Sequence, residues 1–367
     1  MNKAGDAIRD GSKSFFASHY KYLFQLLVIY GINFLVYSIR SPSSDLTDGL
    51  RIGGCFLAGA LLSALSSYMG VAISTDSNIR TSQAAETDGV SKALKVAFTG
   101  SAVYGFVAAG FALLGLSVMF FLSTLGRTDD ITPTQGADLG MELLVGFGLG
   151  CSIMSMFAHI QGSIFAKSSD LGAALVKNEM DGGAQNPVAV AERVGVHIGD
   201  IGGNGGDLFE TFVLAIIAAG TMANGDITLI ALPFWLAGAG VVSSAVGFFF
   251  VSVGNDASKY SVLYGLYRGK LVAAIIFSTL ATVIVSLLFD SIGSGWGILC
   301  CIILGQVFGL FVGQITEAFT VSSCISKSVA NGGATGPVTL VLKALAYGFF
   351  SCIAPAVLIV ALALSTM

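Results

Sequence analysis

Charged residues are scarce in this sequence. Only 11% of its 367 residues are Asp, Glu, Lys or Arg, whereas soluble proteins contain about 25%. The formal net charge is -4, which excludes the strongly basic surface that binds nucleic acids. Hydrophobic residues make up 54% of the chain. A composition this apolar indicates a membrane protein rather than a set of soluble domains.

The sequence also lacks several motifs of soluble enzymes and secreted proteins. It has no GxxxxGK[ST] phosphate-binding loop, no readable nucleophilic triad and nothing that resembles a cleavable signal sequence. Its six cysteines show no CxxC spacing and lie mostly in apolar runs, so we expect small buried hydrophobic residues rather than metal ligands. These cysteines are Cys55, Cys151, Cys300, Cys301, Cys324 and Cys352.

Long apolar runs recur along the whole chain. A helix of about 20 apolar residues crosses the roughly 30 Å hydrocarbon core of a bilayer. The runs, together with 47 glycines that permit close helix packing, predict an all-α bundle of about nine spans. We expect a single transmembrane domain over residues 1–367, in contact with membrane lipids. The predicted spans are Tyr22–Ser38, Ile52–Ser74, Ala97–Leu122, Met141–Phe165, Leu208–Met222, Ile227–Val253, Leu271–Phe289, Trp296–Ile315 and Pro337–Leu364.

The basic residues predict the orientation of these spans, because short loops rich in Lys and Arg stay on the cytoplasmic side. Most of the 18 basic residues fall on the side of the N-terminus. They are Lys3, Arg9, Lys13, Lys21, Arg80, Lys92, Lys95, Lys167, Lys177, Arg193, Lys259, Arg268, Lys270 and Lys327. The opposite loops hold Arg40, Arg51 and Arg127. We therefore expect a cytoplasmic N-terminus, or one on the matrix or stromal side in an organelle.

The longest polar interval, residues 166–207, carries most of the candidate chemistry. Its first part predicts a helix that leaves the membrane, and the residues that share one face of it are Lys167, Asp170, Ala174 and Asn178. In its second part the residues that share a face are Glu192, Val196, Asp200, Gly203 and Asp207. Mg²⁺ prefers oxygen ligands and commonly joins carboxylates to phosphates. The residues alone leave three interpretations open: a solvated acidic loop, a cation or phosphate site, and an ion-conduction path.

Two stretches within this interval resemble the membrane-integral pyrophosphatases, the ion pumps driven by pyrophosphate hydrolysis. They are FAHIQGSIFAKSSDLGAALVKNEM at 157–180 and NPVAVAERVGVHIGDIGGNGGDLFET at 186–211. Upstream, SNIRTSQAAETDGVSKALKVAFTGSAVYG is similar to the same family, and so is QITEAFTVSSCISKSVANGGATGPVTLVLKALAYG downstream. The resemblance thus extends, in order, over nearly the whole chain.

The resemblance implies a dimeric bundle of about sixteen spans, of which this chain corresponds to the N-terminal part. It implies a cytoplasmic Mg²⁺ and pyrophosphate site in which metal ions neutralise the substrate and aspartates activate water, coupled to outward movement of H⁺ or Na⁺. Carried over by motif position, Lys167 corresponds to a substrate-binding lysine and Asp170 to a water-activating aspartate. The metal ligands implied are Asp170, Asp200, Asp207 and Glu192.

The sequence departs from the family pattern at several motif positions. Neutral or weakly basic residues replace charged ones at His159, Ala174, Asn178, Met180 and Val196. The motifs of the family's distal half are also missing. We therefore expect a pseudoenzyme or structural subunit that is inactive alone, as a homodimer or a hetero-oligomer with a partner that carries the missing spans. The alternatives are one half of a split pyrophosphate-energised pump, with pyrophosphate as substrate and Mg²⁺ as cofactor, and a channel or carrier that reuses the bundle.

Overall fold

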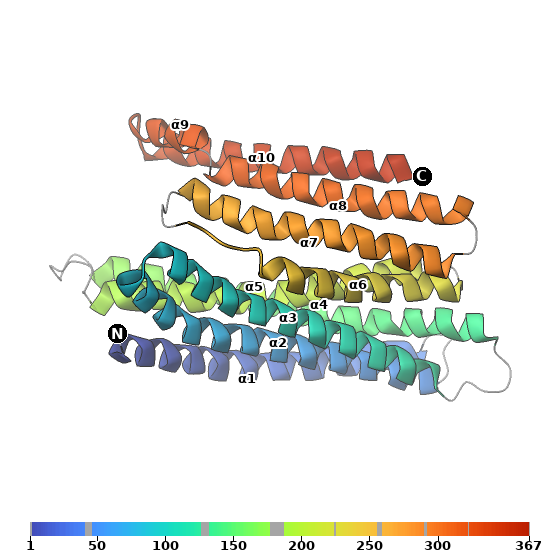
Figure 1. Ribbon diagram of the computed structural model, residues 1–367. Helices are drawn as coiled ribbons and strands as arrows, with labels where there is room; N and C mark the ends of the chain where they lie inside the picture. Colours follow the sequence, from blue (N-terminus) through green and yellow to red (C-terminus); the bar gives the residue numbers. More distant parts are fainter. Residues whose placement is uncertain are drawn as a thin grey trace. The chain divides into compact units, whose positions relative to one another are not determined.

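The computed structural model describes residues 2–40, 46–125, 132–176, 187–223, 225–254, 259–289, 292–321 and 323–366. Within these ranges the chain is helical almost throughout and contains no strand (Figure 1). The helices are α1 (Asn2–Arg40), α2 (Leu46–Thr87), α3 (Val90–Thr124), α4 (Pro133–Val176), α5 (Pro187–Thr221), α6 (Ile227–Phe248), α7 (Lys259–Leu288), α8 (Ile292–Val321), α9 (Ser323–Gly333) and α10 (Pro337–Thr366).

The prediction of a polytopic helical membrane protein is confirmed. In the described part of the chain, eight helices are long and apolar enough to cross a bilayer, namely α2 to α8 and α10. Eight of the nine predicted spans correspond to these helices, but the span predicted over Ile227–Val253 is too long, because α6 ends at Phe248. The remaining one, Tyr22–Ser38, lies in α1, which is not among the eight. The short helix α9 has no counterpart among the predicted spans, because its 11 residues are too few to cross a membrane.

The chain divides into two compact units, residues 1–273 and residues 274–367. The boundary falls within α7, so the first part of this helix belongs to unit 1 and the rest to unit 2. The expectation of one domain over residues 1–367 remains a prediction.

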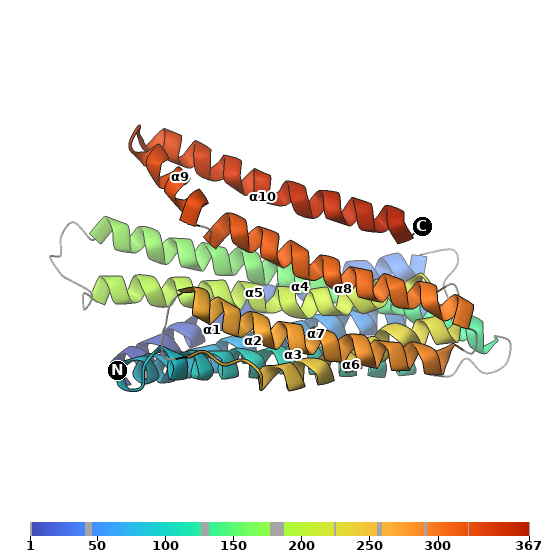
Figure 2. The ribbon, with the colours of Figure 1, turned by 45° about the horizontal axis from the view of Figure 1, so that its top comes forward.

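The core of unit 1 is built from apolar side chains of α1 to α6. Phe147 of α4 and Phe209 of α5 are completely buried, with ring centroids 6.4 Å apart. Leu116 of α3 and Met141 of α4 belong to the same buried cluster. Figures 1 and 2 both show α4 and α5 side by side along most of their length. The long polar end of α4, which the sequence predicts to leave the membrane, is confirmed as helix as far as Val176.

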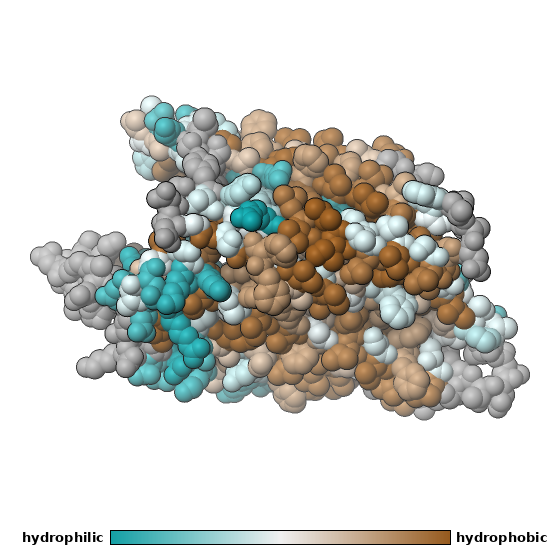
Figure 3. Space-filling model, in the orientation of Figure 1, coloured by the Kyte–Doolittle hydropathy of each residue, from teal (hydrophilic) through white to brown (hydrophobic). Residues whose placement is uncertain are grey.

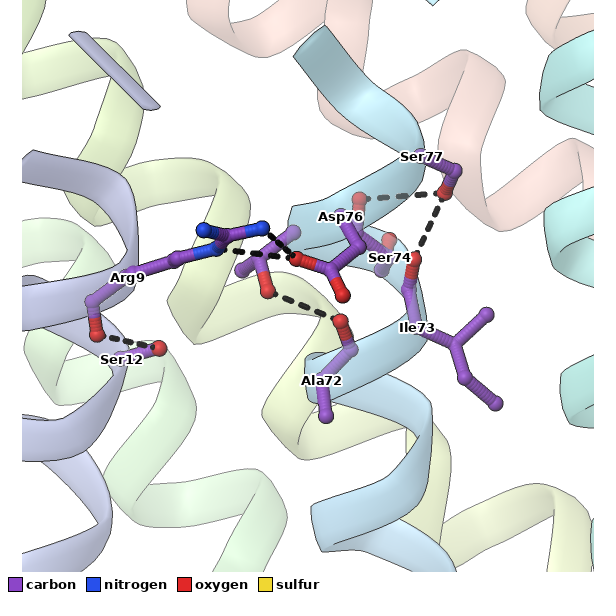
Figure 4. A network of polar contacts seen from close by, with 8 residues as sticks. Arg9, Ser12, Ala72, Ile73, Ser74, Asp76 and Ser77 are labelled. Atoms are coloured by element: carbon purple, nitrogen blue, oxygen red, sulfur yellow. Dashed lines mark hydrogen bonds and ion pairs between the residues drawn. The ribbon is translucent and has the colours of Figure 1, made fainter. Parts of the chain in front are cut away.

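Polar contacts join both halves of α2 to neighbouring helices. In one half, Arg9 of α1 donates from Nε and Nη2 to Oδ1 of Asp76, at 2.9 and 2.6 Å (Figure 4). In the other half, Arg51 donates to the carbonyl oxygens of Ser123 and Leu125, at 3.0 and 2.7 Å. A cation at a helix C-terminus satisfies carbonyls that have no partner within the helix. Arg51 therefore caps α3.

Unit 2 contains the end of α7 together with α8, α9 and α10. Gln306 of α8 accepts a hydrogen bond from Ser278 and donates one to the carbonyl oxygen of Ala274, both at 2.8 Å. Tyr347 of α10 makes a 2.9 Å hydrogen bond with the Ser328 hydroxyl of α9. Most large side chains of α8 and α10 are exposed and apolar, as expected of surfaces that contact lipid or further protein.

Candidate functional site

Two glycines allow α4 and α5 to approach closely in the middle of the candidate site. A methyl group on Gly162 would collide with the carbonyl oxygen of Gly199, and a methyl group on Gly199 would collide with the carbonyl oxygen of Gly162. Only hydrogen fits between the two backbones at these positions. The contact fixes the two helices that carry the predicted site residues of the described chain.

Asp207 of α5 is held by two side chains of α4. Its Oδ2 lies 3.0 Å from Nδ1 of His159, and its Oδ1 accepts a 2.5 Å hydrogen bond from the Ser155 hydroxyl. The side chains of His159 and Asp207 are 51% and 46% exposed, whereas Ser155 is fully buried. Both oxygens of this carboxylate therefore have partners within the chain.

Lys167 and Asp170 lie one turn apart near the polar end of α4. Lys167 Nζ is 3.6 Å from Asp170 Oδ2, and the two side chains are 82% and 51% exposed. Exposed pairs of this spacing contribute little to stability, so both groups remain accessible for a ligand. Ala174, on the following turn of the same face, is exposed as well.

Asp200 lines a separate cavity of about 360 Å³ between α2, α3 and α5. The residues that line it with Asp200 are Gly70, Ser74, Gly100, Ser101, Tyr104, Ile201, Asn204, Gly205 and Leu208. The hydroxyl of Tyr104 donates to the carbonyl oxygen of Gly205. Asp200 and the amide of Asn204, one turn later, give this otherwise largely apolar cavity a polar wall.

The other predicted positions lie nearer the start of α5. Glu192 is half-buried, and its carbonyl oxygen accepts a 3.2 Å hydrogen bond from Ser169 of α4. Val196 is half-buried. Asn178 and Met180 lie outside the described residues.

The predicted metal ligands do not converge on one another. In the described ranges, no group of three or more His, Cys, Asp or Glu side chains is arranged to hold a metal ion. Asp207 contacts α4, Asp200 faces the cavity, and Asp170 lies beside Lys167. The described side chains therefore do not form a Mg²⁺ site by themselves, and the metal ligands remain predictions.

Sequence reasoning missed three polar residues of this region. Ser155 holds Asp207, Tyr104 holds the backbone of α5, and Asn204 lines the cavity. Ser155 lies one turn before His159, so it could have been predicted as a residue on the same face of the helix as His159. Tyr104 comes from α3, and nothing in the sequence indicates its contact with Gly205, a hundred residues further on.

The glycines that flank Asn204 allow three other helices to pack closely against α5. Added methyl groups at Gly202, Gly203, Gly205 and Gly206 would lie 2.9, 3.3, 2.9 and 3.0 Å from neighbouring atoms. Those atoms belong, in the same order, to Phe15, His159, Tyr104 and Ser155. The glycine-rich motif thus lets α5 pack against α1, α3 and α4.

These features define a polytopic helical membrane protein with ionisable groups inside its spanning helices, an arrangement that usually marks a functional site. The chain matches the family model of the inorganic H⁺ pyrophosphatases over residues 1–367. It belongs to that family, as the motifs of α4 and α5 predict.

Relatives of this chain carry names of pyrophosphate-energised pumps. The chain is 34% identical over 371 residues to a K⁺-insensitive pyrophosphate-energised proton pump of Methanosarcina mazei, covering 98% of this chain and 50% of that protein. It is 31% identical over 370 residues to a putative K⁺-stimulated pyrophosphate-energised sodium pump of Clostridium tetani, with the same coverage. The chain therefore spans about half the length of these relatives.

Proposed function

We propose that this chain is a subunit of a membrane pyrophosphatase-type assembly and does not hydrolyse pyrophosphate by itself. The proposal rests on the positions of the acidic side chains, which do not come together at one place in the described residues. Asp170, Asp200 and Asp207 face three different surroundings, and no cluster of ligands forms in the described residues.

The chemistry of pyrophosphate hydrolysis explains why the separation of these carboxylates matters. Phosphoryl transfer depends on metal ions and charged groups that are already positioned around the phosphates. Ala174 and Val196 stand where the family motif has aspartates, so two carboxylates are absent from the proposed site. The carboxylate of Asp207 is already engaged by His159 and Ser155.

In an assembled pump, Lys167 and Asp170 would contact the substrate, and Glu192 and Asp200 would contribute ligands to Mg²⁺. The remaining ligands would come from further residues of the same polypeptide or from a second polypeptide, in a homodimer or hetero-oligomer. The N-terminus and the polar end of α4 would lie on the cytoplasmic side, as the distribution of Lys and Arg predicts.

Pyrophosphate hydrolysis by washed membranes tests the proposal. Membranes containing this chain alone, with Mg²⁺ and pyrophosphate, should release phosphate no faster than membranes from cells with an empty vector. Membranes with a full-length relative serve as the positive control. Mg²⁺-dependent hydrolysis by the chain alone, abolished by Asp170→Asn, would overturn the proposal.

A variant that restores two acidic side chains provides a second test of the proposal. Ala174→Asp combined with Val196→Asp returns two carboxylates to the α4 and α5 faces. We expect calorimetric titration with Mg²⁺ and pyrophosphate to detect binding in the double variant and none in the original chain. Tight binding by the original chain contradicts the proposal that its site is degenerate.

The second candidate is one half of a split pump. It is favoured by Lys167 and Asp170, which keep their motif positions and remain exposed at 82% and 51%. This candidate predicts that a polypeptide with the family's distal motifs copurifies with the chain from its native membrane, and that the complex hydrolyses pyrophosphate. A native complex without such a polypeptide would exclude it.

A further inference from the structure

A group of basic and aromatic side chains surrounds the point in unit 1 where α6 ends and α7 becomes apolar. We call this group the basic border. Its members are Lys95 of α3, Phe249 and Phe250 after α6, and Tyr264, Arg268 and Lys270 of α7. The three basic side chains are exposed. The exposed fractions of Tyr264, Phe249 and Phe250 are 69%, 80% and 47%.

Direct contacts hold the three segments of the basic border together. The rings of Phe98 and Phe248 stack, with centroids 5.6 Å apart and an interplanar angle of 11°. The hydroxyl of Ser91 donates to the carbonyl oxygen of Val253 at 2.7 Å. A methyl group on Gly247 would lie 2.7 Å from the carbonyl oxygen of Gly269. The N-terminal part of α3, the end of α6 and the first part of α7 thus pack at one level.

This level coincides with a step in hydropathy. The predicted spans begin at Ala97 in α3 and at Leu271 in α7, directly after Lys95 and Lys270. Figure 3 shows hydrophilic surface over the first part of α7 beside apolar surface. The basic groups therefore lie at the height of lipid headgroups, with apolar surface directly below them.

The charges of the basic border are not neutralised within the described structure. No carboxylate in the described ranges pairs with Lys95, Arg268 or Lys270, whereas the neighbouring Lys92 has a partner, Asp88, at 3.0 Å. Lys270 Nζ lies 5.7 Å from the ring centroid of Tyr267, a contact that orients the cation without neutralising it. No carboxylate of the described residues therefore competes with an anion for these three positive charges.

We propose that the basic border binds the headgroups of anionic phospholipids. Arg268 and Lys270 are two residues apart on one helix and therefore face different sides of α7. Each of the three basic side chains would contact a headgroup phosphate on its own side, and the acyl chains would run along the apolar surfaces of α6 and α7. Exposed Tyr and Phe rings suit this boundary because one side of them contacts hydrocarbon and the other contacts headgroups. Charge complementarity favours this occupant, since juxtamembrane Lys and Arg attract anionic lipids. The proposal does not depend on pyrophosphatase activity.

Native mass spectrometry of the detergent-purified full chain tests this proposal with two lipids, phosphatidylglycerol and phosphatidylcholine. The test variant is Lys95→Gln, Arg268→Gln, Lys270→Gln. The matched control, Lys13→Gln, Lys21→Gln, Arg193→Gln, removes three exposed basic charges elsewhere in unit 1. Each basic side chain near a membrane surface is worth about fivefold in affinity for anionic lipid. We expect the original chain and the control to retain phosphatidylglycerol at least about tenfold better than the test variant.

Three results would overturn the proposal. The first is equal phosphatidylglycerol retention by the test variant and the original chain. The second is an equal loss in the test and control variants, which would indicate non-specific attraction to net charge. The third is displacement of the lipid by millimolar glycerol phosphate, which would indicate a site for soluble anions. Size-exclusion profiles and circular dichroism of all three proteins establish that each one is folded.

Discussion

The contact between Gly162 and Gly199 leads to a strong prediction about stability. In Gly199→Ala the new methyl group meets the carbonyl oxygen of Gly162, and it also lies 2.9 Å from the backbone nitrogen of Ala166. Backbone atoms cannot rotate away as a side chain can, so α4 and α5 must separate. Overpacking of this kind costs up to about 3 kcal/mol, and the higher helix propensity of Ala returns about 1 kcal/mol. We expect a net loss of about 2 kcal/mol in the free energy of unfolding.

Gly172→Ala is the matched control on α4. Nothing lies within 4 Å of a methyl group at this exposed position, so only the gain in helix propensity remains. We expect Gly172→Ala to melt slightly above the original chain, and Gly199→Ala to melt about 4–8 °C below it. Circular dichroism melts in one detergent measure both. If Gly199→Ala melts at or above the original temperature, the close approach of α4 and α5 is not as described.

Three further predictions concern other parts of unit 1. Tyr104→Phe leaves the carbonyl oxygen of Gly205 without its donor and should cost about 1 kcal/mol in the free energy of unfolding; an unchanged SDS-titration midpoint would contradict that contact. Phe147→Ala, at a fully buried position, should cost about 3–5 kcal/mol, and a smaller loss than for Tyr104→Phe would refute the described core. Hydrogen bonds from Lys92 and, to a smaller extent, from Thr87 lower the pKa of Asp88 below its ordinary value of 3.8. The charged form of Asp88 therefore stabilises the folded chain at pH values above 3.8. This stabilisation is lost as the pH falls through the lowered pKa of the folded state. Between about pH 5 and 3 the original chain should therefore lose more stability than Asp88→Asn, and parallel pH profiles of the two would exclude the Lys92 contact.

The membrane fold was predictable from the sequence because apolar runs report directly on burial in lipid. Long runs such as Ala97–Leu122 and Pro337–Leu364 coincide with helices α3 and α10. The continuation of α4 as a helix to Val176 was also predictable, because helical spacing relates Lys167 to Asp170 and Ala174. The helix α9 was not predicted, because its polar, glycine-containing sequence resembles a loop.

The candidate site was less predictable. Periodicity places Glu192, Asp200 and Asp207 on one face of α5, but it does not reveal which neighbour each residue meets. Asp200 lines the cavity beside α2 and α3, whereas Asp207 contacts α4. These partners depend on how helices distant in sequence pack. Periodicity within one helix carries no information about that packing.

The glycines around Asn204 affect how sequence similarity between this motif and the pumps should be interpreted. Gly203 and Gly205 are each confined by atoms of another helix, so a larger residue there would disturb the packing of α5 whether or not any reaction takes place. An exposed charged position of the same motif, such as Asp200, experiences no such confinement and can change once catalysis is lost. Glycine identity with the pumps therefore records shared architecture, and only the carboxylates and basic side chains record shared chemistry.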